Sequence, residues 1–172
     1  MTSAVIVTVP EAEPVVGELR LRHTYDAPLG VPAHVTLLYP FVPAERVDEV
    51  EERLALLLRG HAAFDAAFAR TARFPDVLYL DPEPAEVFAA LTEAIAGEWP
   101  EHPPYQGAHE TVIPHLTVAE SEDGEFLDRI AAEVEPQLPV RTRIAAATLI
   151  VEDERGRWHE HSRLPLGYSG VA

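Results

Sequence analysis

The chain has 172 residues, enough for one folded domain with a substantial core, and its 47% hydrophobic and 24% charged residues exclude a disordered or collagen-like protein. It contains no cysteine and no lysine, which excludes disulfides, thiolate zinc sites, cysteine nucleophiles, Schiff-base lysines and the P-loop lysine. The net charge of −16 disfavours long nucleic acid as a partner, since a polyanion is repelled by such a field.

The apolar N-terminal residues lack the basic flank of a signal peptide and run directly into Glu11 and Glu13. They are therefore predicted to form a first strand. The longest apolar stretches, 54–58 and 144–151, are much shorter than the roughly 20 residues that cross a bilayer. We expect a cytoplasmic protein with no membrane partner.

The first half of the chain alternates short β-branched runs with helical periodicity. Prolines and glycines separate these segments, as they do at element boundaries. The predicted elements are a strand at 4–9, a helix from Pro14 to Leu21, a strand at 34–39, a helix from Pro43 to Arg59 and a strand at 64–68.

The second half repeats this order, beginning with a strand that is expected to pair with 64–68. Ser121 is the predicted N-cap of the second helix in this half. The predicted elements are a strand at 77–80, a helix at 84–97, a long Pro-, Gly- and His-rich loop at 98–113, a strand at 115–119, a helix after Ser121, and strands at 140–151 and 157–164 joined by a turn at 152–156.

The repeated order indicates an internal duplication, with the two histidine-bearing strands 115 − 34 = 81 residues apart. We predict a bilobal α/β (α+β) fold, a single domain over 1–172 with approximate lobes 1–74 and 75–172. Each pseudo-symmetric lobe has a small sheet with helices and presents one histidine strand to a central cleft.

The two histidine strands carry the same short motif, His34-Val35-Thr36-Leu37 and His115-Leu116-Thr117-Val118. Because side chains alternate along a strand, the histidine and the threonine of each motif share one face, and the apolar residues take the other. Roughly 0.05 such apolar-interleaved matches are expected by chance in a chain of this composition. Two matches at equivalent places therefore predict a site made of two imidazoles and two hydroxyls.

These motifs resemble the defining motif of the two-histidine (2H) phosphoesterase superfamily, in particular its bacterial 2′-5′ RNA ligase-like and cyclic phosphodiesterase members. The resemblance spans nearly the whole chain, and its further elements are Val31-Pro32, Ile113-Pro114, Pro103-Pro104-Tyr105, Trp158 and Leu164-Pro165-Leu166. It implies a bilobal fold in which each lobe presents one motif to a shared cleft. Many RNA ligase-like members carry a basic residue shortly after the second threonine, where this chain has Ala119-Glu120. This departure favours a small cyclic phosphate or a short oligonucleotide end as substrate.

Opening a cyclic phosphodiester requires a proton taken from water on one side of phosphorus and a proton given to the leaving sugar oxygen on the other. His34 and His115 are the predicted catalytic pair, and Thr36 and Thr117 are predicted to bind the non-bridging phosphate oxygens. No metal or cofactor is needed, and the rate should depend on pH in a bell shape. The sequence leaves open which histidine is the base.

Three aromatic residues, Tyr39, Tyr105 and Trp158, are candidates for stacking on the substrate, although aromatic residues beside strands more often belong to the core. Tyr105 is the best placed because it lies in the long loop. The expected partners are a small nucleotide, a cyclic phosphate or short RNA ends, bound by a monomer.

Two other functions remain open. A catalytically silent binding module could hold a nucleotide in the same cleft without any proton transfer. Alternatively, His159 and His161 have strand spacing that places both imidazoles on one face, as in a metal-dependent hydrolase, but no third ligand of matching spacing accompanies them.

Overall fold

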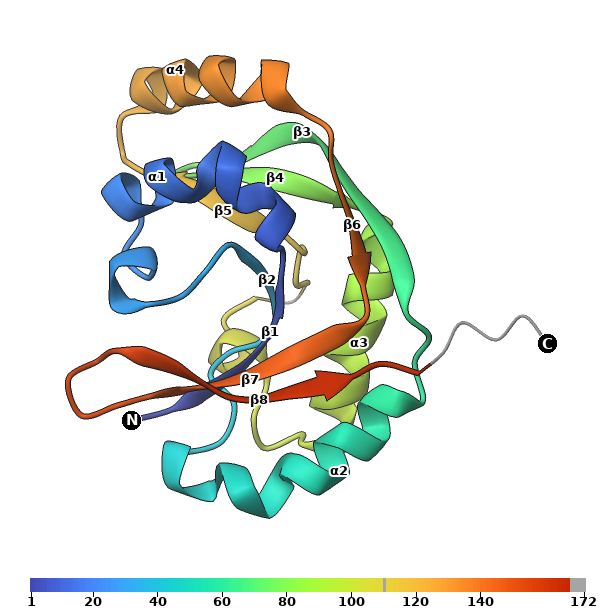
Figure 1. Ribbon diagram of the computed structural model, residues 1–172. Coiled ribbons are helices and arrows are strands. Elements are labelled where there is room, and N and C mark those ends of the chain that lie inside the picture. Colours follow the sequence, from blue (N-terminus) through green and yellow to red (C-terminus); the bar gives the residue numbers. More distant parts are fainter. Residues whose placement is uncertain (110, 168–172) are drawn as a thin grey trace.

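The computed structural model describes residues 1–109 and 111–167, which form two four-stranded antiparallel sheets covered by helices (Figure 1). One sheet has the strand order β2-β1-β7-β8 and the other the order β5-β4-β3-β6. The strands are β1 (Ser3–Thr8), β2 (His34–Leu38), β3 (Phe64–Phe74), β4 (Val77–Glu83), β5 (Leu116–Glu120), β6 (Val140–Ile144), β7 (Ala146–Glu152) and β8 (Trp158–Pro165).

Four α-helices cover the sheets, and short 3-10 turns occur in the connections. The helices are α1 (Glu13–His23), α2 (Val47–Arg59), α3 (Ala85–Glu98) and α4 (Gly124–Val134). Apolar residues three or four positions apart form the buried stripe of each amphipathic helix, as Leu127, Ile130 and Val134 do in α4. No helix among the described residues is long and apolar enough to cross a membrane.

The N-cap of α4 differs from the sequence prediction. Asp123 caps this helix, and its carboxylate accepts the backbone N–H of Phe126 at 3.1 Å. Ser121 lies two residues earlier, and its hydroxyl accepts the N–H of Asp123 at 3.1 Å. The predicted cap was therefore wrong by two positions, since two residues with capping side chains stand close together here.

The predicted strand at 140–151 is in fact two strands that belong to different sheets. β6 pairs with β3, and β7 pairs with β1 and β8 on the other side of Ala145. No proline or glycine interrupts residues 140–151, so the sequence does not show that the chain passes from one sheet to the other.

The predicted lobe boundary between residues 74 and 75 does not separate the sheets. β3 and β4 pair with each other across this point, with Phe74 opposite Val77. The chain then returns to the first sheet with β7 and β8. Each sheet is therefore built from both halves of the sequence, because β3 belongs to the second sheet and β7 and β8 belong to the first.

The bilobal duplicated layout itself is confirmed. β2 and β5, the strands of the two motifs, each form the edge of one sheet, and the two edges lie against each other. The helices are exchanged between the lobes, since α1 packs against β5 and α3 packs against β2 (Figure 1). From α3, the Thr92 hydroxyl donates to the carbonyl oxygen of Leu37 in β2 at 2.7 Å.

Strand β1 is buried on both faces. Val5 and Val7 point into the main core, whereas Ala4 and Ile6 belong to a separate small apolar cluster with Ile150. That second cluster includes Val31 and packs against the partly buried Trp158. It forms an apolar floor beside the motif of β2.

Candidate active site

His34 stands at the start of β2 with both ring nitrogens engaged. Its Nδ1 lies 2.7 Å from the carbonyl oxygen of Pro32, which can only accept a proton, so Nδ1 carries the hydrogen of the neutral ring. The other nitrogen, Nε2, lies 3.2 Å from the hydroxyl oxygen of Thr36. The strand alternation therefore places the imidazole and hydroxyl of this motif together, as predicted.

His115 immediately precedes β5 and repeats this arrangement. Its Nδ1 lies 2.8 Å from the carbonyl oxygen of Ile113, again two residues earlier in the chain. The rings of Phe74 and Tyr79 stand edge to face against the imidazole, with centroids 5.1 and 5.6 Å away. Both histidines thus hold the same tautomer, in which Nε2 is the unprotonated nitrogen that can accept a proton, and in His34 this nitrogen also contacts the Thr36 hydroxyl.

Burial and the positive charge of Arg20 together lower the pKa of His34 to about 4, against the opposing effect of Asp26. The Asp26 carboxylate lies 3.9 Å from Nε2 of this histidine. Burial also lowers the pKa of His115 below its ordinary value. Both imidazoles are therefore mainly neutral at pH 7 in the free protein.

A cavity of about 210 Å³ opens beside His34 and Thr36. Its floor is the apolar cluster of β1 and β7. Tyr39 and Trp158, two of the predicted stacking residues, line it with ring centroids 6.0 Å apart. Tyr25, which is 78% exposed, stands at its rim.

Tyr105, the third predicted stacking residue, lines this cavity and a second cavity of about 430 Å³ that His115 also lines. Its backbone N–H donates to the carbonyl oxygen of Tyr39 at 2.6 Å, and its hydroxyl interacts with Thr36. Its φ of 50° lies in the left-handed region, which costs a residue with a side chain about 1 kcal/mol. Tyr105 therefore lines the cavities of both histidines.

Thr36 and Thr117 are both half-buried on the motif strands. Thr36 lines the cavity of His34. Thr117 lies opposite Tyr79 in the β4–β5 ladder, and its carbonyl oxygen accepts a hydrogen bond from Arg20 at 2.6 Å. Their predicted role in binding phosphate oxygens stays a prediction.

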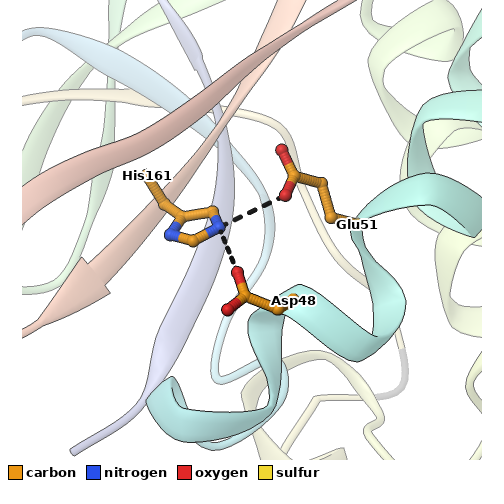
Figure 2. Close-up of side chains that lie close together, drawn as sticks. All are labelled: Asp48, Glu51 and His161. Atoms are coloured by element: carbon orange, nitrogen blue, oxygen red, sulfur yellow. Dashed lines mark ion pairs between the residues drawn. The ribbon is translucent and has the colours of Figure 1, made fainter.

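His159 and His161, whose strand spacing left a metal site open as an alternative, have separate carboxylate partners. Nε2 of His159 lies 2.7 Å from the carboxylate of Asp153 in the adjoining turn. Nε2 of His161 lies 3.1 Å from Asp48 and 3.4 Å from Glu51, both on α2 (Figure 2). Each imidazole has its own carboxylate partners, which draw the two rings apart.

Asp48, Glu51 and His161 could hold a metal ion, because one ligand atom from each lies within 4.8 Å of the others. They lie between α2 and β8 and do not line the cavities of the two motif histidines. The contacts of the imidazole with the two carboxylates account for the same geometry without an ion.

Sequence reasoning missed two charged residues beside His34. Arg20 follows Val16 by four positions on the buried face of α1, and a charge on an apolar helical stripe is a signal that could have identified it. Asp26 lies in a loop rich in proline and glycine, where the sequence offers no comparable signal.

With both motifs presented at facing sheet edges, comparison with known proteins identifies the family. The model of the 2′-5′ RNA ligase superfamily matches residues 8–156. The chain belongs to this superfamily. Its members are two-histidine phosphoesterases, so the resemblance inferred from the motifs is confirmed, and membership supports a phosphoesterase activity.

Several solved structures share the fold of this chain. The protein TT0787 of Thermus thermophilus has 22% sequence identity and a TM-score of 0.60, covering 99% of this chain and 100% of its own. Escherichia coli LigT complexed with 3′-AMP has 16% identity and a TM-score of 0.61, covering 96% of this chain and 97% of its own. A structure described as a phosphoesterase has 16% identity and a TM-score of 0.60, with coverage of 96% and 98%. No curated protein matches the sequence.

The lowered pKa of His34 predicts that the protein loses stability on acidification. The unfolded chain binds a proton at His34 near pH 6.5 and the folded protein only near pH 4, so the unfolded state binds more protons between these values. The contribution of neutral His34 is complete above pH 6.5. It is lost as pH falls toward 4, by up to about 3 kcal/mol.

Urea unfolding at steps from pH 7 to pH 4.5 measures this loss in the wild type and in His34→Gln, which cannot titrate. The variant should lose less stability over the same range. Parallel curves for the two proteins would show that His34 is not held neutral by the fold.

Proposed function

We propose that this protein hydrolyses a cyclic or 2′-linked phosphodiester of a nucleotide, an RNA end or a nucleotide-derived metabolite, by metal-independent acid–base catalysis with His34 and His115. The observation that carries the proposal is the matched pair of imidazoles at facing sheet edges. Each is fixed through Nδ1 by the carbonyl two residues before it and keeps Nε2 for proton exchange.

In the proposed reaction a water oxygen attacks phosphorus while the bond from phosphorus to one ribose oxygen breaks. One Nε2 takes the proton of the water, and the Nε2 of the other histidine gives a proton to the departing ribose oxygen. Thr36 and Thr117 donate hydrogen bonds to the non-bridging oxygens, which hold the charge of the transition state. The histidines exchange roles when the reaction runs in the direction of ligation.

The cavity beside His34 supports a small nucleotide-like substrate. Its apolar floor and the rings of Tyr39, Tyr105 and Trp158 offer flat surfaces of the kind on which a nucleobase stacks. E. coli LigT has been crystallised with 3′-AMP and with NADP+, two ligands of this kind. The Asp26 carboxylate at the cavity and the charge of −16 disfavour a long polyanion.

Loss of either histidine should abolish most of the turnover. General acid or base catalysis contributes about 10²- to 10⁴-fold, so His34→Ala and His115→Ala should each lose roughly that factor in kcat on 2′,3′-cyclic mononucleotides. His159→Ala, a histidine outside both cavities of the motif histidines, is the matched control and should keep wild-type turnover. Assays contain EDTA, and chromatography identifies the 2′- or 3′-phosphate product.

Turnover that disappears with EDTA would contradict the metal-independent mechanism. If the folded wild-type protein binds these nucleotides but converts neither them nor oligonucleotide ends, it is the binding module instead.

The pH dependence of kcat/KM should be bell-shaped with its maximum below pH 6.5. This parameter reports the free enzyme, in which the pKa of His34 is about 4 and that of His115 also lies below 6.5. One imidazole must be protonated and the other neutral, so the product of the two fractions peaks between these pKa values, whichever histidine is the base. Initial rates at low substrate concentration between pH 4 and pH 9 test this, and a maximum at or above pH 7.5 would contradict it.

A further inference from the structure

Arg20 is a buried charged residue, and a charge in such a place needs hydrogen-bond partners. It lies in the last turn of α1 and is 1% exposed. Among the described residues, Arg20 and His34 are the two buried side chains that can carry a positive charge. Burying a cation costs several kcal/mol unless hydrogen bonds and an opposite charge replace its water.

The partners of Arg20 come from both motifs. One terminal nitrogen donates to the carbonyl oxygen of Thr117, in the second motif, at 2.6 Å. The other donates to the Asp26 carboxylate at 3.0 Å and to the carbonyl oxygens of Val31 and Pro32, just before the first motif, at 3.3 and 3.4 Å. A single guanidinium therefore binds the backbone of both facing edges.

The Pro32 carbonyl connects this guanidinium to the imidazole of His34. The same oxygen accepts from Nδ1 of His34 at 2.7 Å, and that bond sets the tautomer and the ring orientation. Because Arg20 also donates to this oxygen, it fixes the position of the Pro32 carbonyl, which in turn orients the His34 imidazole. It does not line the cavity of His34, so it acts through its neighbours.

The charged and titratable groups around His34 come from several elements. Arg20 lies on α1, Asp26 on the following loop and His115 across the cleft before β5. Tyr105 reaches the imidazole through Thr36, and Glu120 of β5 faces Arg20 and Asp26. Arg20 and His115 oppose protonation of His34, whereas Asp26 favours it.

We propose that Arg20 is the positioning residue that holds the two His-x-Thr motifs in their mutual geometry, by binding the Thr117 carbonyl on one side and the Val31 and Pro32 carbonyls on the other. The catalytic part of this inference rests on the proposed function. The structural part, that one side chain fixes both histidines, is independent of the proposed function.

The experiment compares Arg20→Lys and Arg20→Gln with Arg22→Gln. Arg22 lies on the same helix, is exposed and pairs with Glu18, so its variant removes an equal charge without touching either motif. Lysine keeps the charge of Arg20 but lacks the rigid fork that binds several acceptors at once. Urea unfolding first establishes that each variant is folded.

Imidazole ¹⁵N spectra of the free proteins give the first readout, which needs no substrate. The Arg20→Gln change should raise the pKa of His34, because a neighbouring positive charge is lost, whereas Arg20→Lys should keep it low. Both Arg20 variants should shift the resonances of His34 and His115, and Arg22→Gln should shift neither. Because Arg20→Lys keeps the charge and loses only the fork, unshifted resonances of His34 and His115 in this variant would overturn the proposal.

Turnover of 2′,3′-cyclic AMP gives the second readout. Misplacement of catalytic groups by about 1 Å costs roughly a hundredfold in rate, so both Arg20 variants should lose about that factor in kcat with a smaller change in KM. Wild-type kcat in folded Arg20→Lys would overturn the proposal. If the wild type itself shows no turnover, the proposed function fails, while the spectra still decide the positioning role.

Unmodified protein supplies a measurement that does not depend on variants folding. The buried guanidinium N–H protons of Arg20 should exchange slowly and show nuclear Overhauser contacts to both Thr117 and Pro32. Contacts to only one of the two motifs would overturn the proposal.

Discussion

The geometry of the cleft depends on the burial of one positive charge, the guanidinium of Arg20, between two sheet edges. A buried cation loses its hydrogen bonds to water and must replace them with bonds to protein acceptors. Separating those acceptors therefore has a large energetic cost. Those acceptors are the Asp26 carboxylate and backbone carbonyls of both histidine motifs. The same charge opposes protonation of His34. Position and protonation of the site thus have a common physical origin.

The duplicated fold explains why such a tie is needed. β2 and β5 are edge strands, each paired on one side only within its sheet. Their free edges face each other, and the helices crossing between lobes, α1 and α3, bring polar side chains to them. Thr92 of α3 bonds β2 as Arg20 of α1 bonds β5. The exchange therefore places hydrogen bonds from α1 and α3 on the strands that carry the two motifs.

The helices, most strands and the two motifs can be predicted from local sequence patterns. These patterns are the periodicity of apolar residues, the prolines and glycines at element boundaries, and the alternation that places His34 beside Thr36. Sheet membership does not follow from local patterns, because no proline or glycine marks the boundary at Ala145, which separates strands of two sheets. The contacts of Arg20 join residues 97 positions apart. A contact between residues so far apart has no local pattern in the sequence. The signal in this chain is a charge on an apolar helical stripe.

If two imidazoles from different sheets act on one phosphate, both must respond to one phosphate ligand. Titration of the ¹⁵N-labelled protein with 2′-AMP and 3′-AMP, followed through the imidazole resonances, tests this. The Nε2 signals of His34 and His115 should shift together along one saturable curve, while both Nδ1 atoms keep their protons. Shifts confined to one histidine, or separate curves for the two, would contradict a shared site.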